Sequence, residues 1–136
     1  MALPSVGGGY QVGDGNTNEP FMFDQGDPAT PTVTATLTAA QIATQLMVAN
    51  PSTSAAAYTL PTGAAMDAFF TNAKTNSTIG FTIVNIGTSS GAITMTTNTG
   101  FGTLASTGSV TIAVGTSAQF IARKTGDATY ILYRTA

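Results

Sequence analysis

Strand-like segments separated by turn signals fill the second half of this chain and limit its fold more than any other feature. Along them apolar and polar residues alternate with a period of two, the pattern of a half-buried β-strand. The segments are residues 79–86, 92–97, 109–114, 117–123 and 128–134. Glycine-containing turns separate them at about the 8 to 12 residue spacing of sandwiches and barrels. The pattern predicts an all-β fold in which antiparallel sheets pack as a β-sandwich.

Each predicted strand has one apolar face that can pack on a core. The residues assigned to this face are Phe81, Ile83, Val110, Ile112, Phe120, Ala122, Tyr130 and Leu132. The opposite face is also partly apolar and carries Val84, Ile86, Ile131 and Tyr133. We expect this second face to be covered by a helix, by the N-terminal segment or by another copy of the chain.

Shorter elements are predicted in the first half of the chain. Strands are expected at residues 32–37, 45–49 and 58–60. Thr38 and Gln41 have the spacing of a capping box, in which each side chain satisfies a free amide at a helix start, and they predict a single helical turn. One short helix is expected from the capping residue Thr62 to Phe70, with an apolar stripe at three-and-four spacing.

Residues 1–31 predict an extended N-terminal arm, which leaves residues 32–136 as the β-sandwich domain. Glycine and proline are frequent in the arm and disfavour helices and regular strand ladders. Four acids and no base give the arm a charge of −4, against +2 for the domain. The apolar side chains of the arm are expected to contact a neighbouring subunit or a capsid, and they are Tyr10, Val12, Phe21, Met22 and Phe23.

Charged residues are scarce, at 7% of the chain against about 25% in an ordinary domain. Neutral polar residues replace them, above all 26 threonines. The absence of His, Cys and Trp removes thiol and imidazole chemistry and the common soft metal ligands. A net charge of −2 with four basic residues argues against nucleic-acid binding. No apolar run approaches the roughly 20 residues of a membrane span, and no targeting segment is seen, so we expect synthesis in a cytoplasm and no membrane partner.

No catalytic, cofactor or metal residue is assigned, and we expect the protein not to be an enzyme. Asp14, Asn16 and Asn18 alternate as at the start of a calcium-binding loop. Glu19, however, stands where the turn glycine belongs, and Gln25 stands where the bidentate acid belongs. Two carboxylates could in principle hydrolyse a glycoside, but acids on a glycine-rich arm lack the rigid support that catalysis needs.

Three basic residues in the last two predicted strands form a candidate dock for the acidic arm of another chain. They are Arg123, Lys124 and Arg134. A simple solubilising role at a hairpin end is the alternative. Tyr58, Tyr130 and Tyr133 are a candidate platform for stacking on sugars, with core or interface packing as the alternative.

The order and spacing of several short stretches resemble the capsid decoration, or cement, proteins of tailed bacteriophages and related head-fibre domains. The matching stretches are residues 37–41, 58–62, 81–85, 99–101, 109–114, 117–120 and 128–134. The likeness covers about three-quarters of the chain and contains no single diagnostic motif.

The resemblance implies a β-sandwich, jelly-roll-like in topology, that forms a homotrimer on an icosahedral shell. The implied partners are other copies of the chain and a major capsid protein, with no cofactor. The implied location is the exterior of a virion assembled in a bacterial host. The alternative function is that of a fibre or spike tip that binds glycans on the host surface.

Overall fold

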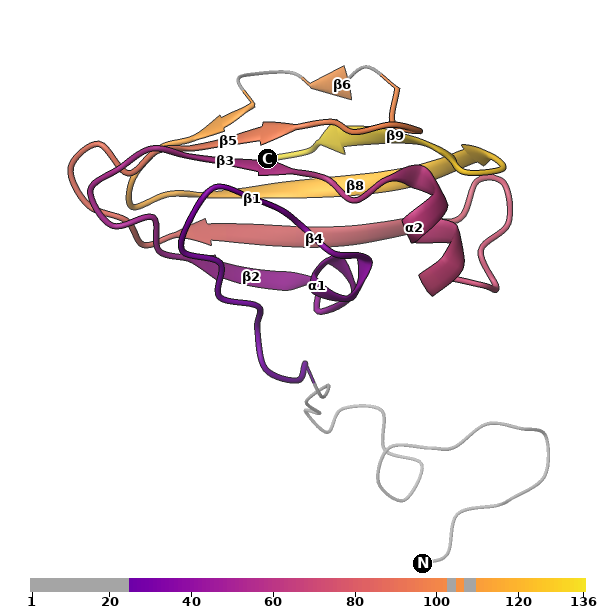
Figure 1. The fold of residues 1–136 in the computed structure, drawn as a ribbon, viewed down its shortest axis with the longest axis horizontal. Helices are drawn as coiled ribbons and strands as arrows, with labels where there is room; N and C mark the ends of the chain where they lie inside the picture. Colours follow the sequence, from indigo (N-terminus) through magenta and orange to yellow (C-terminus); the bar gives the residue numbers. More distant parts are fainter. Residues whose placement is uncertain (1–24, 103–104, 107–109) are drawn as a thin grey trace, which may run out of the picture.

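Two β-sheets and two short helices make up the part of the protein that the computed structural model describes, residues 25–102, 105–106 and 110–136 (Figure 1). The four-stranded sheet has the order β1–β3–β5–β7, with β1 Ala35–Thr36, β3 Ala56–Thr59, β5 Ile93–Thr96 and β7 Thr111–Ile112. The five-stranded sheet has the order β2–β4–β8–β9–β6, with β2 Leu46–Ala49, β4 Thr78–Asn85, β8 Ser117–Gly126, β9 Thr129–Arg134 and β6 Ala105–Ser106. The helices are α1 Ala39–Ala43 and α2 Gly63–Phe69. The all-β, sandwich-like architecture agrees with the prediction.

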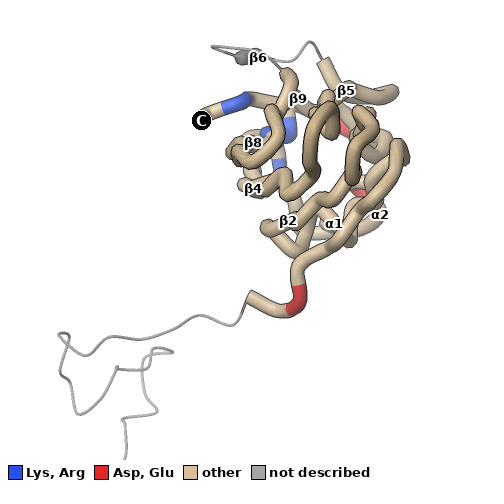
Figure 2. The backbone as a smooth tube through the Cα atoms, turned by 90° about the vertical axis from the view of Figure 1, so that its left-hand side faces the viewer, with Lys and Arg blue, Asp and Glu red and all other residues tan. Residues whose placement is uncertain are grey.

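The expectation of purely antiparallel sheets was wrong, because both sheets are mixed. The pairs β1–β3, β3–β5, β2–β4 and β6–β9 are parallel, whereas β4–β8, β8–β9 and β5–β7 are antiparallel. From β1 to β8 consecutive strands belong to alternate sheets. In the parallel pairs β1–β3, β3–β5 and β2–β4, one strand of the other sheet therefore lies between the two partners along the chain. In Figure 2, β2, β4 and β8 lie on the left of the body and β5 on the right.

Two helices form where one was predicted. The capping box predicted at Thr38 is present, since the Thr38 Oγ1 accepts from Gln41 N at 3.2 Å and the Gln41 Oε1 accepts from Thr38 N at 2.8 Å. The helix that follows, α1, extends beyond the expected single turn because Ile42 is buried and anchors its far end. Thr62 caps α2 as predicted by accepting from Ala65 N.

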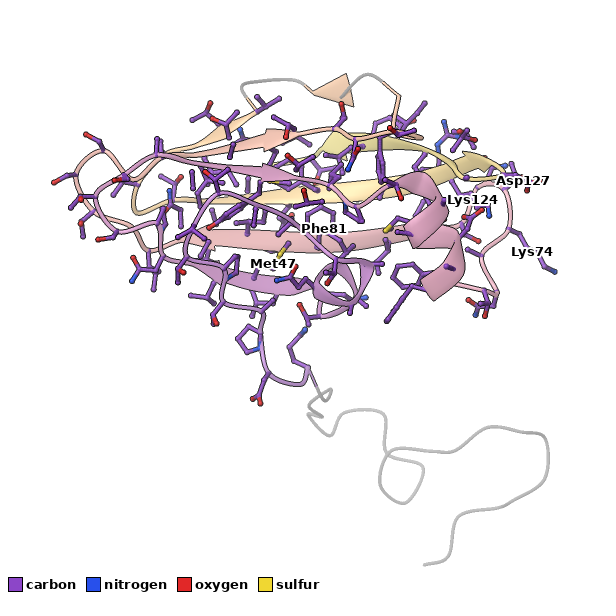
Figure 3. All side chains as sticks on the ribbon, viewed as in Figure 1. Met47, Lys74, Phe81, Lys124 and Asp127 are labelled. Atoms are coloured by element: carbon purple, nitrogen blue, oxygen red, sulfur yellow. The ribbon has the colours of Figure 1, made fainter. Side chains whose placement is uncertain are left out.

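The core lies between the two sheets and uses the predicted face of each long strand. Phe81, Ile83, Ile112, Phe120, Ala122, Tyr130 and Leu132 are all buried. The rings of Phe81 and Phe120 stack with their centroids 5.5 Å apart. Met47, also fully buried, lies near Phe81 in the centre of the view in Figure 3. Val110, assigned to the same face, is half-buried.

The last residues of the predicted arm are joined to the body. Ala29 forms a parallel bridge with Met47 at the edge of β2. Asn50 N donates to Pro31 O, and the hydroxyl of buried Tyr58 donates to the same carbonyl at 3.1 Å. Burial raises the pKa of Tyr58, so its proton stays in this bond at neutral pH. Residues 29–31 are therefore held beside β2, at the edge of the five-stranded sheet.

Candidate interaction surfaces and a buried ion pair

The arm residues predicted to form contacts lie outside the described residues. They are Tyr10, Val12, Phe21, Met22 and Phe23. Their assignment as an interface stays a prediction.

The three residues of the candidate basic dock project in different directions. Strand alternation puts Lys124 on the inner face of β8, where it is 8% exposed, and puts Arg123 on the outer face. Arg123 donates to the Tyr133 hydroxyl and to Asn76 Oδ1 and is bound there by neutral partners. Arg134 donates to Thr111 O, in the four-stranded sheet. The structure does not gather the three charges into one patch.

Lys124 pairs with an acid contributed by α2. Its Nζ lies 2.7 Å from Asp67 Oδ1, which also accepts from the Tyr130 hydroxyl at 2.5 Å. The second oxygen, Asp67 Oδ2, accepts from Ala128 N at 2.8 Å. The cluster lies where α2 meets the β8–β9 turn at one end of the sandwich; Figure 3 shows Lys124 beside α2 and Lys74 projecting outward nearby. Asp67 thus fastens the helix to the hairpin.

The electrostatics of this cluster favour a structural role over proton transfer. Hydrogen bonds from Lys124, Tyr130 and the backbone of Ala128 lower the pKa of Asp67 to about 2. Burial and the bond to Asp67 raise the pKa of Tyr130. A general acid or base works best with a pKa near the working pH, and here both groups are moved away from neutrality. The carboxylate is instead a permanent acceptor for three donors.

The sequence contains a signal for this pair in the alternation of β8. Lys124 follows Ala118, Phe120 and Ala122 at the inward-facing positions of one strand. An inward lysine requires an acid partner, because burying an unpaired charge is very costly. The only acids in the predicted domain were Asp67 and Asp127. Choosing between them needs the position of α2, which alternation does not give.

Two of the three tyrosines proposed as a sugar platform are buried. Tyr58 and Tyr130 are 0% and 4% exposed, and both hydroxyls are bound within the domain. The Tyr130 ring stacks on Phe101 with centroids 5.4 Å apart. Tyr133 is half-buried beside Arg123, whose Cζ lies 5.7 Å from the ring centroid. Buried rings cannot stack on a sugar, so this geometry argues against the three-ring platform.

Neutral side chains line three hollows on the surface of the described domain. A groove of about 500 Å³ between α1 and α2 is almost wholly apolar, with Phe69, half exposed, at its rim. A cavity of about 330 Å³ lies between α2 and the start of β4, bounded by Met66, Phe70 and Ile79. A third hollow of about 360 Å³ lies over Gly80 on the outer face of the five-stranded sheet. Figure 2 shows the few charged segments on an otherwise neutral chain.

Within residues 25–102, 105–106 and 110–136, no three His, Cys, Asp or Glu side chains gather closely enough to hold a metal ion. In the same segments, no helix has the length and hydropathy to cross a membrane. Comparison with protein-family models, with curated proteins and with solved structures finds no match.

Proposed function

We propose that this chain is a structural protein of a virion, a capsid decoration or cement protein that binds the outside of a bacteriophage head and stabilises it. In this proposal it forms a jelly-roll-like homotrimer, contacts the major capsid protein and carries out no reaction. Its partners include neither nucleic acid nor membrane. It would be made in the bacterial cytoplasm and act on the capsid exterior.

The neutrality of the three hollows is the observation that carries this proposal. A site for a phosphate, a carboxylate or a metal needs charged or strongly polar groups that converge. Asp67 and Lys124 form an ion pair that joins α2 to the β8–β9 hairpin. Neutral apolar and amide surfaces suit extended contacts with another protein. Each such contact has a modest affinity, but many contacts repeated on a symmetric particle give strong overall binding.

The short strands at the sheet edges offer a second means of attachment. β1 and β7, at the two edges of the four-stranded sheet, have two residues each. An incoming extended segment can add to such an edge through main-chain hydrogen bonds, but a two-residue strand limits the shared ladder to a short stretch. The 24 residues before Gln25 can reach up to roughly 80 Å when extended, far enough to meet a neighbouring subunit or the shell.

A rebinding assay tests the proposed function. Heads from phage lacking the gene for this chain are mixed with the purified full-length protein and sedimented. The proposal predicts saturable binding at a fixed number of copies per head and greater resistance of the loaded heads to heat. Bovine serum albumin at equal concentration is the control for trapping. Absence of the protein from the sedimented heads would contradict the proposal.

Native mass spectrometry of the free protein tests the proposed trimer. A trimer at micromolar concentration is expected if the assembly forms before docking. A monomer under the same conditions would contradict a preformed trimer and leave assembly to the capsid.

A further inference from the structure

The outer face of the five-stranded sheet carries several apolar side chains. An antiparallel or mixed sheet with one free face commonly places polar side chains there. In this sheet the outward positions include half-buried Leu46, Val48, Val84, Ile121, Ile131 and Tyr133. Polar side chains such as Thr82 and Gln119 lie between them, so the face offers both apolar surface and hydrogen-bonding groups to a segment that packs on it.

A depression at the middle of this face has room for a large side chain. Gly80 of β4 is in register with Ile121 of β8, and Ile121 is in register with Tyr133 of β9. A Cβ atom built on Gly80 would lie 3.8 Å from Phe120 O and 4.0 Å from Ile121 Cγ1, which are ordinary van der Waals contacts, so side-chain atoms can fit over the glycine without a clash. The resulting hollow of about 360 Å³ is floored by the sheet and flanked by Thr82, Gln119 and Ile121.

The described chain begins at this same hollow. Gln25 is one of its lining residues, and its side-chain amide donates to Thr44 O, just before β2. Phe21, Met22 and Phe23 precede Gln25 by two to four residues. An extended chain advances at most about 3.6 Å per residue, so all three side chains originate within roughly 14 Å of Gln25.

The charge on this sheet face is opposite to the charge of the segment before Gln25. Arg123 projects from this face and hydrogen-bonds two neutral side chains, Asn76 and Tyr133. The segment before Gln25 carries Asp24 and Glu19 and no base. The segment is joined to its own sheet by a short stretch of chain. Its effective concentration at that sheet is therefore far higher than its concentration at the sheet of another molecule.

We propose that the segment Phe21–Met22–Phe23 packs across the outer face of the five-stranded sheet of its own chain and places an aromatic ring over Gly80. A strand glycine has no side chain to pack, and an aromatic ring placed over it supplies the missing contact. The segment then fixes the root of the arm to the domain. Tyr10 and Val12, farther out, remain for contact with another subunit. The proposal does not depend on the proposed function.

Tryptophan reporters test this packing, because the native chain contains no Trp. Phe21→Trp and Phe23→Trp are made separately in the full-length protein. Val33→Trp is the solvent-exposed reference, since Val33 is 67% exposed. At least one of the two arm reporters should emit at shorter wavelength than Val33→Trp and resist quenching by iodide. If both emit and quench like Val33→Trp, the proposal is wrong.

A second substitution locates the contact. Gly80→Glu places a charged side chain in the hollow and should return the arm reporter to the emission and quenching of the reference. Ile121→Thr removes apolar surface without filling the hollow and should weaken the protection of the arm reporter from iodide. It replaces Gly80→Glu as the test if that variant does not fold. Protection that neither substitution changes would overturn the proposal. So would protection that disappears on dilution in parallel with dissociation of an oligomer, because a second copy would then be the occupant.

Discussion

Asp67 shows how one side chain can fasten a helix to a hairpin in a chain with few charges. Its two oxygens accept from Lys124, Tyr130 and the amide of Ala128, and its side chain is 25% exposed while that of Lys124 is 10% exposed. The gain from such a pair comes mainly from avoiding an unpaired buried charge. The contribution of Asp67 should therefore be visible in the pH dependence of stability.

Asp67→Asn is predicted to destabilise the protein at neutral pH and to flatten its stability profile in acid. The pKa of Asp67 is about 2 when folded, against an ordinary value of 3.8. A lowered pKa stabilises the fold above the ordinary value, and this stabilisation is lost as the pH falls through the folded value. We expect a loss of about 1 to 2 kcal/mol near neutrality, allowing for partial solvent exposure.

Urea unfolding of the wild type and of Asp67→Asn from pH 6 down to about pH 2 measures this difference. The two free energies of unfolding should converge as the pH falls from 3.8 towards 2. Asp127→Asn is the matched control, because Asp127 is an exposed acid of the β8–β9 turn. Equal loss in both variants would contradict a specific role for Asp67.

Asn85 has a similar role at the other end of the sandwich, through its side-chain amide. It is 1% exposed, its Nδ2 donates to Gly91 O and to Ile112 O, and its Oδ1 accepts from Gly87 N. Because Ile112 belongs to the four-stranded sheet, the bond connects the two sheets. We predict that Asn85→Ala costs about 3 kcal/mol in chemical denaturation, since it leaves buried backbone groups unpaired. Exposed Asn72→Ala should change stability little, and equal effects would refute the role.

At the scale of elements, the start of α2 is fixed by very close backbone packing. A Cβ atom built on Gly63 would lie 1.9 Å from Ala128 O, which is main chain and cannot rotate away. We predict that Gly63→Ala destabilises the fold by about 2 to 3 kcal/mol through overpacking. Gly102→Ala is the matched control, because its added methyl group would meet nothing closer than 3.4 Å. A thermal midpoint unchanged by Gly63→Ala would show that the junction is looser than described.

The presence of most strands and of both helix starts could be predicted from the sequence, because alternation and capping residues are local features of the chain. The alternation in residues 117–123 and 128–134 correctly assigned buried Phe120 and Leu132 to one face. The capping residues Thr38 and Thr62 also marked helix starts. β6, at Ala105–Ser106, was not predicted, because two residues are too few to show a period.

Strand pairing could not be predicted, because periodicity identifies the two faces of a strand but not the sheet to which it belongs. The chain alternates between sheets, so β2 pairs in parallel with β4 although β3 intervenes. The ion pair between Lys124 and Asp67 could not be predicted for the same reason. The two residues are far apart in sequence, and only the placement of α2 against the β8–β9 turn brings them together.

At the scale of the whole molecule, the arm and the domain have separable roles in the proposed function. Deletion of residues 1–20 removes Tyr10 and Val12 and keeps Phe21–Phe23. Because the described core lies wholly beyond the deletion, the β-sheet circular dichroism spectrum should be retained. We predict that the truncated protein no longer sediments with heads in the rebinding assay. Binding equal to that of the full-length protein would contradict a role for residues 1–20 in attachment to the head.

Electron microscopy of the virion tests the central claim most directly. Gold-labelled antibody against this chain is applied to intact phage particles and to particles lacking its gene, and cryo-electron reconstructions of both heads are compared. We predict label over the head surface of intact particles and extra density at symmetry-related positions on the head exterior, both absent without the gene. Label confined to tail fibres or spikes, or two identical heads, would contradict the account.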